Sequence, residues 1–539
     1  MYISDTIVES LIKENVDTVF GYPGGAVVPL YESLRKSKIN HVLVRHEQAA
    51  AHSASGYSRS SGKVGVCMAT SGPGATNLIT GIATAYMDSI PMVVITGQVG
   101  SESIGKDVFQ EADVVGSTEP FTKHNYLVKD PDDIPRIIRE AFYIANTGRK
   151  GPVLIDIPVD LQRLKAKKKL SNEMDIPGYK PTVKGHIGQI KRALRKIKSA
   201  KRPVICAGGG IISSGACEEL RIFVKKSGIP VVHTLMGIGC VETNCESYIG
   251  MLGSHGHKKA NEVISRADLI VVVGTRLGDR ATIGNRILDE MPDIIHIDID
   301  PAEVGKIVES TIPLVGDANN ILSRLNKEIK PVDIAPWKEE IKGIEEKPSN
   351  DDMKEGYLNP REAILTLSKY LDGNAVVTAD VGQNQIWAAR NIVIKDNMKF
   401  FTSGGLGTMG YSLPAAIGAK VANPEGKVVC VLGDGGLQMS LGELGTLANV
   451  KGGMVVLLIN NGRLGMVREL QDIHVGKGVY YGIDLMNNPD FGLIAEAYGM
   501  KKCRPSSMEE FDSVIEKAIK SDDKWLVECV VDPDIWSTI

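Results

Sequence analysis

The 539-residue sequence lacks the features that would place a protein at a membrane or outside the cell. Its longest apolar runs, such as PMVVIT and LIVVVG, are far shorter than the roughly 20 residues needed to cross a bilayer. The first residues, MYISDTIVESLIKE, have neither a basic start nor an apolar stretch, so we expect no signal peptide. The eight cysteines form no CxxC pair and mostly lie in apolar runs, which is typical of reduced, buried thiols. These absences predict a cytoplasmic protein.

Blocks of charge of one sign are missing too. The formal net charge is -3, and the charged residues are scattered along the chain. Binding to nucleic acid or to an anionic membrane normally requires a concentrated basic patch. We therefore expect small-molecule partners, and neither nucleic acid nor membrane.

The chain does have a regular alternation of short β-branched runs and helical stretches. Runs such as VGVCMAT, LIVVVG and MVVLLIN are continuously apolar, as in parallel sheets covered on both faces. Two charged, proline-containing segments, residues 162–185 and 331–360, interrupt the alternation as linkers do. A single core stops growing at roughly 250 to 300 residues. We predict three α/β domains, each a doubly wound parallel sheet, over residues 1–165, 186–335 and 357–539.

The first and third predicted domains resemble each other. In the first, the small-residue helix HEQAAAHSASGYSR precedes the strand VGVCMAT, the turn SGPGATN, a helix and the strand PMVVITG. In the third, GTMGYSLPAAIGAK precedes VVCVLGD, the turn GDGGLQMS, a helix and MVVLLINN. The matching order indicates a duplicated unit. Ligand groups in corresponding turns predict a site between the two copies, at the carboxyl ends of their strands.

The strongest chemical signal is Gly433-Asp434-Gly435, with Asn460-Asn461 at the end of the next apolar run. Glycines let the backbone approach a phosphate at a helix start, and Asp434 with the Asn461 amide oxygen offers hard oxygen ligands. Magnesium bound to a diphosphate fits this set. The alternative is that these residues only cap the following helices. The pair is more specific than a lone glycine motif, and it resembles the signature of thiamine-diphosphate enzymes.

That resemblance implies a ligand set. Asp434 and Asn461 would bind the metal through their side chains, and Arg463 through its backbone carbonyl. The residues expected to contact the phosphates through amide groups are Gly435, Gly436, Leu437, Gly382, Gln383 and Asn384. The family to which the first domain is most similar usually has His at position 384, but the Asn384 amide can still donate a hydrogen bond.

Glu47, at the start of an Ala/Ser-rich stretch, is the second signal. A carboxyl bonded to the aminopyrimidine of thiamine diphosphate shifts its tautomer, so that the exocyclic nitrogen can take the thiazolium proton. The alternative is an exposed Glu that only favours the helix dipole. Gly407 and Met409, in GGLGTMG, match the segment that holds the cofactor bent in this family, although most Met residues are core filler.

Within the family, the first domain resembles acetohydroxyacid synthase catalytic subunits in the strings VFGYPGGA, RHEQAAAH, ATSGPGATNL, GKDVFQEAD and TKHNYLV. The resemblance implies that Gly25 and Ala26 face the reactive carbon. Phe109, Gln110 and Lys123 would line the substrate entrance. Arg280, in GTRLGDR, would hold the carboxylate of the incoming 2-oxoacid, a role that suits a planar bidentate donor. A surface ion pair is the alternative for this arginine.

The middle domain carries glycine turns at strand ends, such as AGGGIISSGA and VGTRLGDR. In the resembled family these turns hold a structural FAD. The residues expected to touch it are Arg149, Gly208, Gly209, Thr234, Leu252, Gly274, Arg276 and Asp298. Glycine turns alone are weak evidence, so a vacant or differently filled domain is the alternative.

The resemblance implies an acetolactate synthase of branched-chain amino-acid biosynthesis, which decarboxylates pyruvate and joins the two-carbon unit to a second 2-oxoacid. That acceptor would be pyruvate or 2-oxobutyrate. Leu470 stands where a Trp selects 2-oxobutyrate, Val159 replaces the usual Lys near the entrance, and the chain ends without the family's longer tail. A homodimer or homotetramer and a small regulatory subunit are implied as partners.

Three other functions remain open at this point. The chain could be another thiamine-diphosphate enzyme, such as a 2-oxoacid decarboxylase, a glyoxylate carboligase or a sulfoacetaldehyde acetyltransferase. Glu47 counts against the glyoxylate enzyme, which lacks this carboxylate. A flavin- or nicotinamide-dependent oxidoreductase would use only the middle domain and leave the Gly-Asp-Gly and Asn-Asn motifs without purpose. A non-catalytic binding module would not explain why the full set of residues expected to bind the cofactor is present.

Overall fold

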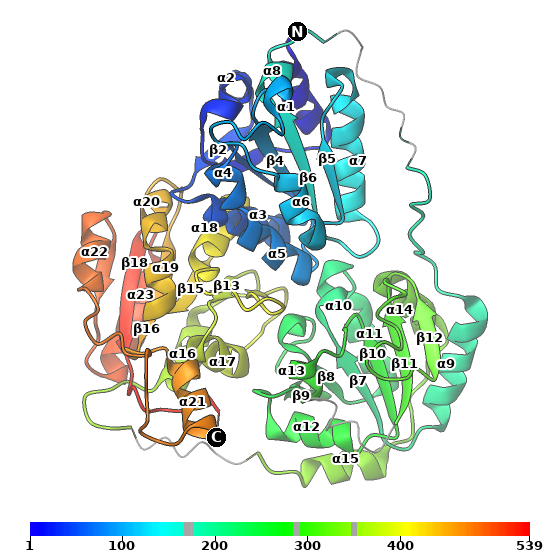
Figure 1. Ribbon diagram of the computed structural model, residues 1–539. Helices are drawn as coiled ribbons and strands as arrows, with labels where there is room; N and C mark the ends of the chain where they lie inside the picture. Colours follow the sequence, from blue (N-terminus) through cyan, green and yellow to red (C-terminus); the bar gives the residue numbers. More distant parts are fainter. Residues whose placement is uncertain (167–173, 175, 284–291, 347–352, 539) are drawn as a thin grey trace.

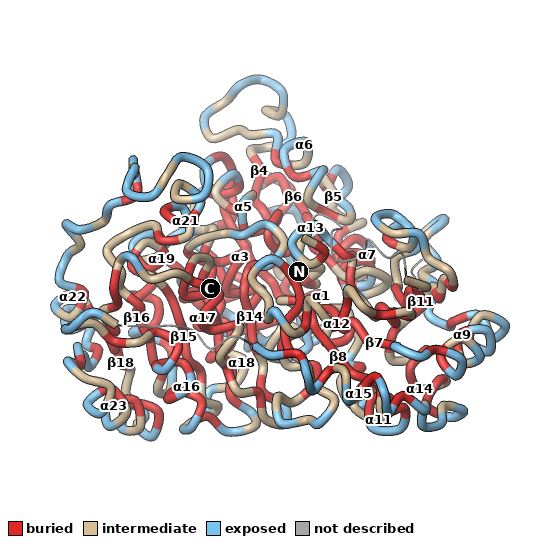
Figure 2. The backbone as a smooth tube through the Cα atoms, turned by 90° about the horizontal axis from the view of Figure 1, so that it is seen from below, coloured by how far each residue is buried: buried red, intermediate tan, exposed pale blue. Residues whose placement is uncertain are grey.

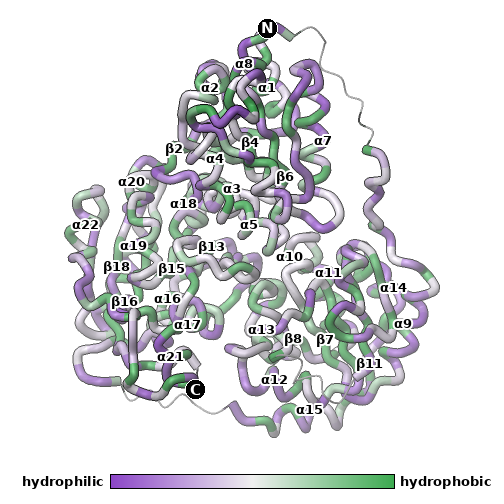
Figure 3. Tube along the Cα trace, viewed as in Figure 1, coloured by the Kyte–Doolittle hydropathy of each residue, from purple (hydrophilic) through white to green (hydrophobic). Residues whose placement is uncertain are grey.

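A computed structural model describes residues 1–166, 174, 176–283, 292–346 and 353–538. The chain forms three lobes, each built on a six-stranded sheet whose strand pairs are all parallel (Figure 1). The central strands are buried, whereas exposed residues lie on some of the edge strands and on the outer helices and loops (Figure 2). Apolar residues correspondingly concentrate inside each lobe (Figure 3). The prediction of three doubly wound parallel sheets is confirmed.

The first lobe has the strand order β2-β1-β3-β4-β6-β5. Its strands are β1 (Thr18–Gly21), β2 (Asn40–Leu43), β3 (Gly65–Ala69), β4 (Met92–Gln98), β5 (His124–Leu127) and β6 (Pro152–Pro158). Its helices are α1 (Ile3–Lys13), α2 (Val28–Arg35), α3 (Glu47–Ser61), α4 (Pro73–Thr76), α5 (Ile79–Met87), α6 (Val114–Thr118), α7 (Ile134–Asn146) and α8 (Val159–Gln162).

The third lobe has the order β14-β13-β15-β16-β18-β17, which is the same topology with every strand advanced by twelve. Its strands are β13 (Val376–Ala379), β14 (Lys399–Phe401), β15 (Val428–Gly433), β16 (Met454–Asn460), β17 (Lys501–Cys503) and β18 (Lys524–Val530). Its helices are α16 (Pro360–Tyr370), α17 (Gln383–Asn391), α18 (Ser412–Ala422), α19 (Asp434–Met439), α20 (Leu444–Leu447), α21 (Gly465–His474), α22 (Phe491–Ala497) and α23 (Met508–Lys520). The two lobes are therefore versions of one unit.

The middle lobe has the order β12-β11-β10-β7-β8-β9. Its strands are β7 (Pro203–Ala207), β8 (Val231–His233), β9 (Tyr248–Met251), β10 (Leu269–Val273), β11 (Asp293–Asp298) and β12 (Ile312–Val315). Its helices are α9 (Ile187–Ser199), α10 (Gly209–Ser213), α11 (Cys217–Ser227), α12 (Lys258–Ser265), α13 (Asp279–Thr282), α14 (Ala318–Glu328) and α15 (Ala335–Lys342). Trp337 and Ile341 of α15 belong to this core, so the middle unit continues past residue 335 into the segment expected to be a linker.

The first and third lobes meet along the crossing of α3 and α18 (Figure 1). A Cβ atom on Gly56 would lie 1.9 Å from the carbonyl oxygen of Ala415, and one on Gly418 would lie 1.9 Å from that of Ser53. Both glycines are needed because the backbones approach too closely for any side chain. Polar bonds extend the contact: Arg59 Nη1 donates to the Thr402 carbonyl at 3.0 Å.

The middle lobe rests on both neighbours. Arg149 of the first lobe forms ion pairs with Asp300 and Glu303 at 3.3 and 2.8 Å. On the other side, Ile238 and Met251 pack into a core cluster of the third lobe. No helix among the described residues is both long and apolar enough to cross a bilayer.

Candidate active site

Asp434 and Asn461 follow neighbouring parallel strands and meet at one edge of the third sheet. β15 ends at Gly433, which is in register with Ile459 near the end of β16. The backbone N–H groups of Asn461 and Gly435 form hydrogen bonds with the Asp434 carboxylate. Asn488 Nδ2 donates to its Oδ2 at 2.6 Å. The structure thus places the Asp434 carboxylate beside the backbone of Asn461. Metal binding by the two side chains stays a prediction.

The Asp434 carboxylate is buried, with 1% of the residue exposed. Burial raises its pKa to about 6, although hydrogen bonds from Asn488 and the nearby amides act in the opposite direction. No ion pair among the described residues gives it a basic partner. A buried carboxylate that has no ion-pair partner among the described residues fits a hard divalent cation.

The described part of the chain contains no group of three or more His, Cys, Asp and Glu side chains that could share an ion. This finding does not bear on the predicted magnesium set, which contains one carboxylate, one amide and one backbone carbonyl.

Gln383 and Asn384 begin α17 beside this edge, after Gly382 with its φ of 137°. Gln383 is buried and turned inward: its Oε1 accepts a hydrogen bond from Asn461 Nδ2 at 2.8 Å. Asn384 Nδ2 donates to the Asp380 carbonyl at 2.8 Å, and its Oδ1 lies near Gly433. Both side chains are therefore held by protein groups next to the predicted diphosphate position.

The start of α19 is closed in by its own neighbours. A Cβ on Gly436 would lie 2.7 Å from Asp380 Oδ1, and one on Gly435 would lie 3.2 Å from Met409 Cε. Leu437, the next residue, is fully buried. Met409 therefore lies against the Gly-Asp-Gly turn, and Gly407 in the same segment has a φ of 74° with open space around it. That this segment holds the cofactor bent stays a prediction.

Asp380, which the sequence did not single out, supports this arrangement. Its carboxylate accepts hydrogen bonds from the backbone of Gly410 at 2.9 Å and of Ser412 at 2.8 Å. Burial raises its pKa to about 6, and these bonds oppose the rise. Asp380 thus fixes the segment that carries Met409 to the start of α18.

Glu47 is the first residue of α3 in the first lobe, where His46 caps the helix. Asn77 Nδ2 donates to its Oε2 at 2.9 Å. A Cβ on Gly74 would lie 3.4 Å from its Oε1, so the glycine leaves that oxygen accessible. Gly25 and Ala26 begin a short 3-10 helix on the same lobe, where Thr70 Oγ1 accepts from the Ala26 amide at 3.1 Å.

No hydrogen bond between described residues joins Glu47 to Asp434 or Asn461. The nearest link is Glu443, which follows α19 in the chain. It accepts hydrogen bonds from the backbone of Arg45 and His46 at 2.9 and 3.0 Å. The entry to the Glu47 helix is therefore tied to the third lobe of the same chain.

The predicted entrance residues have different surroundings. Gln110 has a φ of 59° and packs against Gly72, and Phe109 beside it is 87% exposed. Lys123 Nζ donates to the Thr147 carbonyl at 2.7 Å and to Tyr179 at 2.9 Å, at the end of α7. Burial lowers the pKa of Lys123 to about 8. In this conformation the ammonium group holds the helix end, and its predicted place at the entrance stays a prediction.

Arg280 lies on α13 with an exposed side chain, and its nearest carboxylate is that of Asp279 at 3.8 Å. Its charge acts on His255, whose pKa is lowered first by burial and then by Arg280 and Arg390, while Glu469 of α21 raises it. The charges of Arg280 and of Glu469 thus act on the same histidine in opposite directions. The roles of Arg280 and Leu470 in substrate choice stay predictions.

The residues predicted to contact FAD mostly gather at the carboxyl edge of the middle sheet, at the ends of β7, β8, β10 and β11. They are Gly208, Gly209, Thr234, Gly274 and Asp298, with Leu252 and Arg276 close in sequence to β9 and β10. A Cβ on Gly208 would lie 2.3 Å from the Gly274 carbonyl, so backbone contact alone requires that glycine. Arg149 is paired with Asp300 and Glu303.

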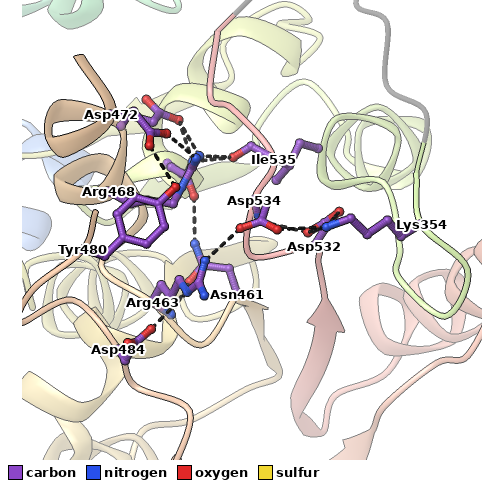
Figure 4. Close-up of polar contacts among 12 residues, drawn as sticks. Lys354, Asn461, Arg463, Arg468, Asp472, Tyr480, Asp484, Asp532, Asp534 and Ile535 are labelled. Carbon is purple, nitrogen blue, oxygen red and sulfur yellow. Dashed lines mark hydrogen bonds and ion pairs between the residues drawn. The ribbon is translucent and has the colours of Figure 1, made fainter. Parts of the chain in front are cut away.

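Sequence reasoning missed two parts of the site. Asn488, which bonds Asp434, lies in the irregular segment LMNNPDF and carried no motif signal. The segment Asp532–Ser537 packs beside Asn461 and Arg463 (Figure 4). Only contacts between distant parts of the chain reveal either one.

Comparison with known proteins covers all three lobes. The thiamine pyrophosphate enzyme family matches with its N-terminal TPP binding domain at residues 1–117, its central domain at 190–325 and its C-terminal TPP binding domain at 380–529. The acetolactate synthase large subunit of Corynebacterium glutamicum is 45% identical over 99% of this chain and 87% of its own length. The probable acetolactate synthase large subunit of Methanocaldococcus jannaschii is 44% identical over 98% and 92%. The acetolactate synthase isozyme 3 large subunit of Escherichia coli is 43% identical over 96% and 92%.

Proposed function

We infer the function of this chain from its family. It belongs to the thiamine pyrophosphate enzymes, among the acetolactate synthase large subunits. It is a thiamine-diphosphate-dependent carboligase that decarboxylates pyruvate and joins the remaining two carbons to a second 2-oxoacid. The observation that carries this conclusion is identity of 43–45% with such large subunits over nearly the whole chain. Glu47 begins α3 of the first lobe, and Asp434 and Asn461 follow β15 and β16 of the third lobe, which supports the proposal.

For the metal, we propose magnesium held by Asp434, the Asn461 amide oxygen and the Arg463 carbonyl. The burial of Asp434 without a basic partner supports this set. Backbone amides at the start of α19 would donate to the diphosphate, because the first N–H groups of a helix have no partner within the helix. The donors are all oxygen atoms, which suits magnesium better than a soft transition metal.

Thiamine diphosphate supplies a carbon nucleophile that can take up pyruvate and release carbon dioxide. Glu47 would hold a proton at Oε1, the oxygen that Gly74 leaves open, while Asn77 orients the carboxylate through Oε2. A carboxyl group placed in this way can serve as the acid and base for the aminopyrimidine. The buried alanines and serines of α3 keep bulk water away from that position.

For assembly, we propose at least a homodimer in which Glu47 of one chain faces the Asp434 edge of another. The absence of a hydrogen bond between these groups within the described residues of one chain supports this arrangement. Exposed Phe109 and the exposed apolar residues Leu470 and Ile473 of α21 are surfaces that a second chain could cover. The relatives are named large subunits, so we also propose a small regulatory subunit as a further partner.

For the middle lobe, we propose FAD at the carboxyl edge of its sheet. The convergence of Thr234, Gly274 and Asp298 at that edge supports a dinucleotide, because such ligands bind beyond the carboxyl ends of parallel strands. We propose Arg280 as the carboxylate-binding residue and Leu470 as the residue that sets acceptor choice. The exposed side chain of Arg280, whose ion-pair partner among the described residues is Asp279 at 3.8 Å, supports the first of these roles.

Product analysis tests the function. Purified protein is given magnesium, thiamine diphosphate and pyruvate, with and without 2-oxobutyrate and FAD. We expect acetolactate, and competition between the acceptors measures what Leu470 allows. An absorption spectrum of the purified protein reports bound flavin independently of turnover. Acetaldehyde as the sole product, or no consumption of pyruvate, would contradict the synthase assignment.

A further inference from the structure

We propose that the C-terminal segment Asp532–Ser537 orients the magnesium ligands, with Gln383, Glu469 and Asp534 as its positioning residues. The proposal rests on the magnesium site proposed above. It concerns groups that do not touch the metal and that act through Asn461 and Arg463 (Figure 4).

The segment is fastened at several points after β18 ends at Val530. Lys354 forms ion pairs with Asp532 at 3.1 Å and with Asp534 at 2.9 Å. Farther along, the Trp536 carbonyl accepts hydrogen bonds from Arg361 Nη2 at 3.0 Å and from Trp387 Nε1 at 3.4 Å. These contacts bring the chain back across the lobe to the side of α21.

The first connection to the metal ligands runs through Asp534. Its carboxylate pairs with Arg463 Nη1 at 2.8 Å, and Asp484 pairs with Arg463 Nε at 3.1 Å. The arginine is therefore held from both sides. Because the proposed ligand is the backbone carbonyl of Arg463, restraint of its side chain also restrains the turn that presents this oxygen.

The second connection runs through Gln383 and decides which way the Asn461 amide faces. Gln383 Nε2 donates to Glu469 Oε1 at 2.6 Å and to the Ile535 carbonyl at 2.8 Å. Two acceptors on the nitrogen side leave only Oε1 to face Asn461, whose Nδ2 donates to it. The Asn461 oxygen is thereby turned to the opposite side, where it accepts from the Arg463 amide at 3.0 Å.

Glu469 ties this amide pair to the end of the segment. Its Oε1 accepts from the Ser537 amide at 2.5 Å, and its Oε2 accepts from Ser537 Oγ at 2.8 Å. Gly465 makes room for the pair, because a Cβ there would lie 1.9 Å from Gln383 Oε1. The side chains of Gln383, Glu469 and Ser537 each have hydrogen-bond partners, as a network that fixes one orientation requires.

Arg468 locks the helix that carries Glu469. It is 1% exposed, donates to the Ile535 carbonyl at 2.8 Å and pairs with Asp472 at 2.9 Å. Its guanidinium also lies over the Trp536 ring at 5.4 Å. The segment and α21 are thus joined through Arg468, and we expect the positions of Asn461 and Arg463 to depend on both.

The test compares Glu469→Ala, Glu469→Gln and Asp534→Ala with the unaltered protein. Magnesium affinity is measured by calorimetric titration in the presence of thiamine diphosphate, and thermal unfolding is followed without cofactor. Loss of a residue that orients a ligand typically weakens metal binding 10- to 100-fold, which we expect for Glu469→Ala. Glu469→Gln, which retains an acceptor, should fall in between. Asp534→Ala should lose at most about five-fold, because its ion pair is half exposed.

Asp523→Ala is the matched control. It breaks a similarly exposed pair with Lys501 in the same lobe, away from the site, and should leave magnesium affinity unchanged. High magnesium should restore the turnover of Glu469→Ala. Because magnesium also stabilises any folded variant that binds it, the unfolding temperature without cofactor shows whether a loss of stability explains the defect. If Glu469→Ala fails to fold, Glu469→Gln and Asp534→Ala carry the test.

The outcomes separate the two proposals. Unaltered protein that binds no magnesium overturns the metal site and this proposal with it. Unaltered protein that binds magnesium, together with folded Glu469 and Asp534 variants that bind it equally well, overturns the positioning role alone.

Discussion

Replacement of Glu47 by Gln tests the acid–base role directly. Gln has the same shape, and its carbonyl oxygen can still accept the hydrogen bond from Asn77 that the structure places at 2.9 Å. What is lost is a group able to bind and release a proton at Oε1. Acid–base catalysis by a positioned side chain contributes about 10²- to 10⁴-fold, so we expect kcat for acetolactate formation to fall by that factor. At 1.36 kcal/mol per tenfold, this is about 3 to 5 kcal/mol of activation free energy.

The assay pairs initial rates of acetolactate formation with calorimetric titration of thiamine diphosphate. Cofactor affinity should stay within about threefold, because the lost group acts in the chemical step rather than in holding the diphosphate. Glu32→Gln, on an exposed carboxylate of the same lobe, serves as the matched control and should keep full activity. A folded Glu47→Gln enzyme with kcat within tenfold of the unaltered protein would remove Glu47 from the mechanism.

Three further predictions use other parts of the structure. Gly418→Ala should lower the free energy of unfolding by about 1 to 3 kcal/mol or more in denaturant titrations, because its Cβ would lie 1.9 Å from the Ser53 carbonyl. Gly278→Ala, with open space around it, should change it little, and equal effects would contradict the helix-crossing argument. Asn488→Ala should weaken magnesium binding about tenfold, since it removes the bond that orients Asp434; unchanged affinity would make Asn488 a bystander. Burial lowers the pKa of His52 to about 3, so the unfolded chain binds more protons below about pH 6.5 and stability falls as the pH drops toward 3, by up to about 1.4 kcal/mol per pH unit. His52→Gln should flatten this slope between pH 7 and 5, and an unaltered slope would mean that other groups govern it.

Local patterns in the sequence were sufficient for the three sheets. Runs such as VVCVL and MVVLLI are continuously apolar, and only strands covered on both faces tolerate that pattern. The duplication was visible because the same order of helix, strand and turn occurs twice, and the two sheets have equivalent topologies. The linker expected at 331–360 is shorter than predicted, because α15 lies within it and packs Trp337 into the middle core. The sequence of this segment does not show that packing.

The pairing of Asp434 with Asn461 was also within reach of the sequence. Parallel strands that are neighbours in a sheet end at the same edge, so the residues that follow β15 and β16 lie close together. The same reasoning does not give the direction of a flexible side chain. Lys123 has a motif that suggests an entrance, yet its ammonium group bonds the end of α7, where carbonyls lacking helical partners attract a cation.

By itself, the sequence determined the fold class, the duplicated halves, the family and the residues at the strand ends, because each depends on neighbours within a few positions or on one strand-to-strand step. The tertiary structure decided the α3–α18 crossing, the part played by Asn488 and the attachment of Asp532–Ser537 to Gln383 and Glu469. These contacts join residues from 54 to more than 350 positions apart. Their geometry depends on how whole lobes pack, and no local pattern of side chains encodes it.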